Sequence, residues 1–219
     1  MRLKHLLLAS LVALSSTAAF AQQKTGLYLY GTKHQRGGDA IAQQTANLYV
    51  YDNCHVKAYD QSQIWVHDTC DCEAYGQTTV TAKAQTKVKS FDNTRVIASN
   101  FSKIDANGSC SVIATENVTV DCHGNVSVNA ANNCVVNADG NCTIMARDKV
   151  KVVATGHCIV MALGNAEIDA SEHVTVKAYE NAKVNAKEGV TVEAWGDSQI
   201  TASDGVIVEQ HDNAKVIKK

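Results

Sequence analysis

The sequence predicts an all-β protein, a single-chain β-solenoid of the two-sided roll type in which two eight-residue units form each 16-residue coil. Three observations lead to this prediction. Aliphatic residues recur at every eighth position, alanine follows most of them two residues later, and turns rich in Asp, Gly and Asn separate the units. In addition, residues 174–189, VTVKAYENAKVNAKEG, are echoed by residues 190–205, VTVEAWGDSQITASDG. Such a repeat is typical of stacked coils that complete one another's core.

The octads keep one register from Asn47 to the end of the sequence. Position two is aliphatic from Leu48 to Val216 except at Cys72, position four is mostly alanine, and position eight is small or β-branched. These positions are two residues apart, which is the period of a β-strand, so their side chains point inward. Positions five to seven, such as YDN or YGQ, form turns. The octad region, residues 47–219, is therefore expected to form about ten coils of a solenoid.

The first residues predict export. Arg2 and Lys4 precede the apolar run LLLASLVAL, and Ala19-Phe20-Ala21 closes the segment, as in a cleaved Sec signal peptide over residues 1–21. The run is too short to cross a bilayer, so we expect no transmembrane segment in the mature chain and a periplasmic, cell-surface or secreted location. Residues 22–46 are expected to be an N-terminal cap, with TGLYLYG as a strand and KHQRGGD as a mobile loop.

The charge of the chain gives no indication of a polyanionic partner. The formal net charge is −2 at pH 7, and removal of Arg2 and Lys4 makes it −4. This balance disfavours nucleic acid as a partner. The complete absence of proline suits continuous backbone hydrogen bonding along a sheet.

The Val-x-Ala octads with Tyr-Asp-Asn or Tyr-Gly-Gln corners, from Val56 to Val216, resemble tandem arrays of uncharacterised bacterial and phage proteins. They are more distantly similar to the Val-x-Gly octads of phage tail needles and type VI spike tips, and that resemblance implies an intertwined trimeric β-prism. Alanine in place of glycine and the double-octad rhythm favour the single-chain roll, and the trimer is the alternative.

The cysteines allow two interpretations. All eight fall at inward positions of an exported chain, where disulfides are common. Cys54 with Cys70 and Cys142 with Cys158 are each two octads apart and stack on adjacent coils, while Cys110 and Cys122 are expected to meet across the core. The alternative, which we favour slightly, is that cysteine is a small apolar filler.

Signals for metal binding and catalysis are weak. His157 and His173 stack at one corner beside Glu172 and are the best candidates for a metal site, although an exposed, solvated corner is much the commoner explanation of such a pair. Asp105 and Asp121 stack on one face, where proximity could raise a pKa, but a surface ladder with Lys87 and Lys103 explains them too. We find no nucleophile paired with a base, and we expect no cofactor and no enzymatic activity.

The two faces of the predicted roll differ, which is the functional clue. One face carries charged residues such as Lys57, Glu73 and Lys89. The other carries a nearly uncharged stripe at position three, in which Thr81 and Asn129 interrupt the large residues Tyr49, Trp65, Ile97, Ile113, Met145 and Met161. Exposed apolar stripes of this extent mark interfaces, while cross-strand stabilisation of the sheet is the alternative explanation.

These observations favour a non-enzymatic structural or interaction rod that binds itself or a surface protein through this stripe. The alternative is a ligand- or glycan-binding adhesin that uses aromatic residues near the N-terminal end, namely Tyr49, Tyr51, Tyr59, Trp65, Tyr75 and Phe91. Ice binding ranks lower, because Thr79 and Thr81 form the one outward threonine pair of the stripe.

Overall fold

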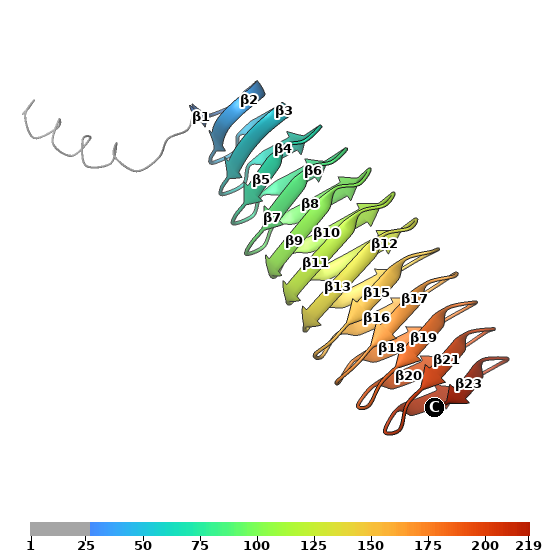
Figure 1. Ribbon diagram of the computed structural model, residues 1–219. Helices are drawn as coiled ribbons and strands as arrows, with labels where there is room; N and C mark the ends of the chain where they lie inside the picture. Colours follow the sequence, from blue (N-terminus) through green and yellow to red (C-terminus); the bar gives the residue numbers. More distant parts are fainter. Residues whose placement is uncertain (1–26) are drawn as a thin grey trace, which may run out of the picture.

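The computed structural model describes residues 27–219 and shows a β-solenoid of about 12 turns with ~16 residues per turn, which confirms the predicted fold class. Successive coils stack along a rod that runs from the blue N-terminal strands to the red C-terminal ones (Figure 1). The predicted signal peptide lies outside the described residues. Within the described part of the chain, no helix is long and apolar enough to cross a membrane.

The rod consists almost entirely of short strands and corners. The strands are β1 (Leu27–Leu29), β2 (Thr32–Ala42), β3 (Asn47–Ala58), β4 (Gln63–Val66), β5 (Asp71–Ala74), β6 (Thr79–Ala82), β7 (Lys87–Ser90), β8 (Arg95–Ser99), β9 (Lys103–Gly108), β10 (Ser111–Thr115), β11 (Thr119–Gly124), β12 (Ser127–Ala131), β13 (Val135–Gly140), β14 (Thr143–Ala146), β15 (Lys151–Ala154), β16 (Ile159–Ala162), β17 (Glu167–Ala170), β18 (Thr175–Ala178), β19 (Lys183–Ala186), β20 (Thr191–Ala194), β21 (Gln199–Ala202), β22 (Ile207–Gln210) and β23 (Lys215–Lys218).

Each strand pairs in parallel with the strand one coil further along the rod. Val112 of β10, for example, lies beside Val96 of β8 and Val128 of β12, so partners are separated by two octads of sequence. The even-numbered strands β4 to β22 therefore stack into one side of the rod, and the odd-numbered strands β5 to β23 into the other. We call these sides the even face and the odd face. Strand β3 turns a corner and contributes to both.

The core is a set of columns made by positions eight, two and four, as predicted. Leu48, Ile64, Ile104, Ile144 and Ile200 are its largest fully buried side chains, and valine and alanine fill most of the rest. Because one chain supplies both faces of this core, the fold is the predicted single-chain roll and not the intertwined trimer.

Carboxylates at position six link each corner to the corner above or below it in the adjacent coil. The backbone N–H of Gly156 donates to Glu172 Oε2 at 2.7 Å, and the N–H of Gly164 donates to Glu180 Oε2 at 2.9 Å. The same bond joins Gln44 to Asp60, Asp52 to Asp68, Gly76 to Asp92, and Gly196 to Asp212. Many position-six residues have a positive φ, which glycine adopts most readily. This geometry explains the recurrence of Gly, Asp and Glu in the corners.

The N-terminal region extends the coil beyond the octads. β2 pairs with β3 and β1 pairs with β2, which accounts for the turns beyond the predicted ten. The expectation that KHQRGGD forms a mobile loop is wrong, because these residues belong to β2 and pair with β3. The register shifts between Arg36 and Gly38, and this irregularity hides the strand from an eight-residue pattern.

The C-terminal coil is the least enclosed. Gln210 and Lys218 occupy positions where earlier coils have small buried residues, and both are exposed. Val208 and Val216 are only partly buried against the core. The apolar columns therefore thin out at this end of the described chain.

Candidate functional site

The even face presents two straight rows of outward side chains. The third-position row contains Tyr49, Trp65, Thr81, Ile97, Ile113, Asn129, Met145 and Met161, each beside the next through parallel pairing. The first-position row runs beside it from Asn47 to Ile159. Ile97 is 37% exposed and Ile159 is 49% exposed, while Ile113, Met145 and Met161 are half-buried by their neighbours in the row. We call the two rows together the even-face stripe.

The two rows of the stripe contain almost no charged residues, although the guanidinium of the corner residue Arg147 lies 2.7 Å from Met145 Sδ. Arg95 is the one charged residue in the two rows between Asn47 and Met161. Beyond Met161 the third-position row continues with Lys177 and Glu193, whose ion pair of 3.0 Å from Nζ to Oε2 ends the uncharged section. The odd face differs, since ion pairs such as Lys57–Glu73 at 3.1 Å and Lys151–Glu167 at 3.3 Å connect its strands.

Aromatic rings form ladders rather than one platform. Tyr49 stacks on Trp65 with 4.5 Å between ring centroids, and His34 extends this ladder at 4.8 Å from Tyr49. Tyr59, Tyr75 and Phe91 form a second ladder at a corner, with centroid distances of 5.1 and 4.9 Å.

The six aromatic residues named as candidates for glycan binding are therefore divided among separate ladders. Tyr51 stacks on His67 at a centroid distance of 5.2 Å and lies 6.4 Å from His34, so His34 joins this ladder to that of Tyr49, while Tyr59, Tyr75 and Phe91 lie apart at their corner. The sequence pattern missed His34 because its spacing to Tyr49, its partner in the sheet, falls short of two full octads. Rings inside a ladder cover one another's faces and present mainly their edges.

All eight cysteines are buried free thiols in this structure, at the inward positions that the pattern predicted. The Cys54 N–H donates to Cys70 Sγ at 3.4 Å, and Cys142 lies beside Cys158, so both stacked pairs are neighbours. Cys122 also has Cys142 as its thiol neighbour, whereas Cys110 Sγ lies 3.1 Å from Thr94 Oγ1. The bridges Cys54–Cys70 and Cys142–Cys158 stay predictions, whereas Cys110 and Cys122 have different neighbours from the contact across the core that was expected between them.

The side chain at position eight donates a hydrogen bond to a corner carbonyl, which cysteine, serine and threonine can all do. Cys110 Sγ donates to the carbonyl of Asn107 at 3.0 Å, and Cys134 Sγ donates to the carbonyl of Ala131 at 3.0 Å. Ser102 Oγ makes the same bond to the Ser99 carbonyl at 2.7 Å. Each side chain thereby satisfies a corner carbonyl three residues earlier, which supports the interpretation of cysteine as a filler.

Burial raises the pKa of several of these thiols. Desolvation raises the pKa of Cys72 to about 12 and that of Cys70 to about 11. Hydrogen bonding with Cys122, followed by burial, raises the pKa of Cys142 to about 11. Because the thiolate is the nucleophilic form of cysteine, these protonated side chains are poor nucleophiles at neutral pH.

The histidine pair predicted as a metal candidate is formed, with 5.1 Å between the ring centroids of His157 and His173. The neighbouring Glu172 carboxylate is already occupied by the backbone N–H of Gly156. Across residues 27–219, no group of three or more His, Cys, Asp or Glu side chains has an arrangement that could hold a metal ion.

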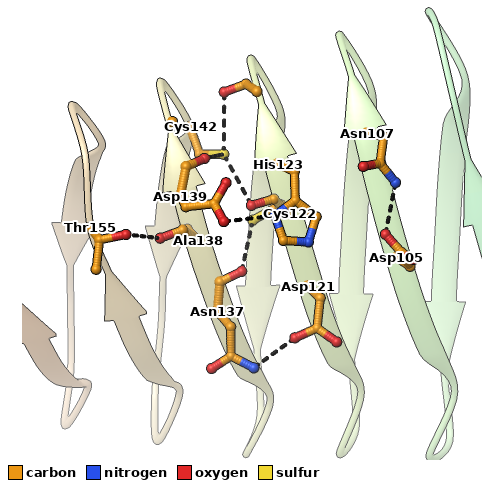
Figure 2. Close-up of polar contacts among 12 residues, drawn as sticks. Asp105, Asn107, Asp121, Cys122, His123, Asn137, Ala138, Asp139, Cys142 and Thr155 are labelled. Atoms are coloured by element: carbon orange, nitrogen blue, oxygen red, sulfur yellow. Dashed lines mark hydrogen bonds and ion pairs between the residues drawn. The ribbon is translucent and has the colours of Figure 1, made fainter.

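The carboxylates considered for acid–base chemistry are held by amide groups on the odd face (Figure 2). Asn107 Nδ2 donates to Asp105 Oδ1 at 2.7 Å, and Asn137 Nδ2 donates to Asp121 Oδ1 at 2.7 Å. His123 Nδ1 lies 2.8 Å from Asp139 Oδ2 in the same region. The Asn137 and His123 contacts connect consecutive coils, and they are the bonds expected of a ladder that stabilises the sheet.

Comparisons with family models, curated proteins and solved structures found no match for this chain. The fold and surface define its class, a β-solenoid rod with one charged face and one nearly uncharged face.

Proposed function

We propose that the protein is an exported, non-enzymatic rod that associates with itself or with a surface protein through the even-face stripe. The observation that carries this proposal is the contrast between the two faces. The two rows of the stripe between Asn47 and Met161 contain one charged residue, while the odd face over the same coils carries many charged side chains, including the ion pairs Lys57–Glu73 and Lys151–Glu167. Export is inferred from the sequence of residues 1–21.

Burial of the stripe offers a favourable free energy that the odd face does not. Ile97 and Ile159 are exposed, and Ile113, Met145 and Met161 are half-exposed, so contact with a partner removes further apolar surface from water. Apolar burial is worth roughly 25 cal/mol per Å². Exposed ion pairs contribute little, typically about 0–1 kcal/mol each.

The experiment that tests this proposal changes the charge of the stripe. Replacing Ile113→Lys together with Met145→Lys is expected to abolish association and to leave the far-ultraviolet circular dichroism and the melting temperature nearly unchanged. Lys89→Glu on the odd face is the matched control and is expected to have no effect. Association is measured by sedimentation equilibrium of the mature protein and by capture of partners with immobilised protein. Unchanged association of the double lysine variant would contradict the proposal.

A second candidate function is glycan binding at the N-terminal end of the same face. Trp65 ends the His34–Tyr49–Trp65 ladder, and its next neighbour in the row is the smaller Thr81. One ring face is thus less covered than those inside the ladder, and sugars stack on such faces. Loss of glycan binding in Trp65→Ala, with binding retained in Phe91→Ala, would support this candidate over the first.

A further inference from the structure

The third-position row of the even face is symmetric about Asn129. Ile113 and Met145 lie one coil away on either side, and Ile97 and Met161 lie two coils away. Thr81 and Lys177 follow at three coils. The row therefore has the same apolar profile over the two coils on either side of Asn129. A surface with this property can face a copy of itself.

Building on the proposed function, we infer that the partner is a second copy of this chain, related by a two-fold axis along β12. A rotation of 180° about an axis parallel to the strands makes the two rods antiparallel and leaves the strand direction unchanged. The third-position row of one chain therefore lies over the third-position row of the other, and the first-position rows likewise face each other. The contacts of a two-fold interface are self-complementary, and residue i of one copy meets residue j of the other. In this arrangement Ile97 faces Met161, Ile113 faces Met145, and Asn129 faces Asn129.

The outer parts of the row are complementary as well. Four coils from Asn129, Trp65 faces Glu193, and five coils from it, Tyr49 faces Glu209, so an indole N–H and a phenol O–H lie opposite carboxylates. Tyrosine and tryptophan are favoured at interfaces because one large side chain supplies apolar area and a hydrogen-bond donor. Lys177 faces Thr81, so no charged group of this row lies opposite a charge of the same sign.

A parallel arrangement of the two rods is less favourable. With third-position rows in contact, Lys177 would face Lys177 and Glu193 would face Glu193, which places like charges together. With the rows offset so that first-position residues face third-position ones, Ile113 would face Ser111 and Met145 would face Thr143. The apolar centre of the third-position row would match itself in the first of these parallel arrangements as well, so the like charges at Lys177 and Glu193 are what disfavour it. The antiparallel arrangement combines the apolar match of this row with the absence of like-charge contacts.

A stable dimer through the even face requires the two rods to overlap along the whole row. The row from Tyr49 to Glu209 spans about 48 Å and a strand of the face is about 13 Å wide, which gives about 1,200 Å² for two copies. This is the lower end of the range for specific interfaces, about 1,200–2,000 Å². A rod shifted by half its length would fall well below it. The register that matches the side chains is also the register that overlaps the whole row.

Asn129 has a defined role in this interface. A single polar residue in the apolar centre of a seam favours one register, because a shift of one or two coils leaves its amide opposite an apolar side chain. On the two-fold axis, each Asn129 amide meets its own copy and the two can exchange hydrogen bonds.

Cross-linking tests the direction of the two rods. Thr81→Cys and Lys177→Cys each place one outward thiol on the even face, and the eight native thiols are buried and serve as the unreactive background. Facing sheets are about 10 Å apart, so a bifunctional maleimide of about that span is suitable. The expected result is at least tenfold more cross-linked dimer in an equimolar mixture of the two variants than in either variant alone. Lys89→Cys on the odd face is the control and should not cross-link.

Two results would contradict the antiparallel dimer without contradicting the proposed function. Efficient cross-linking within each single variant would show parallel rods, and association through the stripe would still stand. An unsubstituted protein that stays monomeric, with variants that never cross-link, would exclude the dimer. In that case, a surface protein captured by the unsubstituted chain but not by the Ile113→Lys, Met145→Lys variant would still support the proposed function.

A charge pair at residue 129 tests the position of the axis. Asn129→Asp alone and Asn129→Lys alone place like charges on the axis and should dimerise at least tenfold more weakly than the unsubstituted protein. An equimolar mixture of the two variants should regain dimers, because Asp then faces Lys. A mixture that associates no better than the single variants would show that residue 129 does not face its own copy.

Discussion

Single residues at the corners decide how closely consecutive coils can stack. At position six a glycine column runs through Gly108, Gly124, Gly140 and Gly156, all with positive φ. A Cβ atom on Gly156 would lie 2.8 Å from the carbonyl oxygen of Gly140, whereas a Cβ on Gly76 would lie 3.3 Å from the carbonyl oxygen of Asp60. The corners at Gly140 and Gly156 approach too closely for a side chain, which explains why glycine recurs there.

This difference predicts unequal effects of two alanine substitutions. Both Gly156→Ala and Gly76→Ala incur the cost of a left-handed backbone conformation, about 1–2 kcal/mol. Gly156→Ala should in addition force the two corners apart, so we expect its free energy of unfolding to be lower by about 1 kcal/mol more. Urea denaturation measures both values. Equal losses would show that the close approach has no energetic weight.

The buried thiols predict how stability depends on alkaline pH. Their pKa values in the folded state, about 11 for Cys70 and Cys142 and about 12 for Cys72, lie above the ordinary value of 9.0. Below pH 9 the thiols are protonated in both states, so their contribution to the free energy of unfolding is complete there. As the pH rises further, the unfolded chain loses protons first, and this contribution is lost.

We therefore expect the free energy of unfolding to be flat through neutral pH and to fall between about pH 9 and pH 12. Denaturation under reducing conditions at a series of pH values measures this dependence. Cys72→Val, which gives position two the aliphatic side chain found in the other octads, should make the fall less steep. An unchanged slope in that variant would mean that Cys72 titrates normally.

At the scale of the strand, stability depends on the columns rather than on any one element. Most strands are as short as β15, which presents two inward side chains, Val152 and Ala154. So short a strand cannot bury an apolar face alone, and its hydrogen bonds depend on the coils before and after it. A defect in one coil is therefore transmitted to both neighbours.

A carboxylate placed in the core tests this interdependence. Val136 is fully buried in β13, while the adjacent Val135 is half-exposed beside Thr119 and Lys151. Val136→Asp buries an unpaired charge, and we expect a loss of about 4 kcal/mol or more, with unfolding of the middle coils. Val135→Asp, its immediate neighbour, should cost less than about 1 kcal/mol. Hydrogen exchange of β11 to β15 shows the difference. Equal protection in the two variants would contradict the assigned inward positions.

For the whole molecule, the octad pattern predicted the coil, its period and its buried columns, because each of these depends on residues at a fixed spacing. The octad pattern did not predict the first turns. The sequence spacing between paired residues of β2 and β3 is shorter than two octads up to Arg36 and equals two octads from Gly38 onward. His34 was missed for the same reason.

Contacts across the core were less predictable than contacts along a face. Cys54 and Cys70 are stacked neighbours as expected, because spacing alone places them on one face. Cys122 lies beside Cys142 rather than Cys110, because contacts across the core also depend on the axial offset between the two faces, which an eight-residue pattern does not contain.

Small-angle X-ray scattering of the mature protein is the most decisive measurement of side-by-side association through the even-face stripe. Paired rods should have twice the mass of one chain and a maximum dimension near that of a single rod, about 60 Å for the stacked coils. The Ile113→Lys, Met145→Lys variant should have half the mass at the same length. A doubled mass with a doubled length, or the mass of one chain at all concentrations, would contradict self-association through this face.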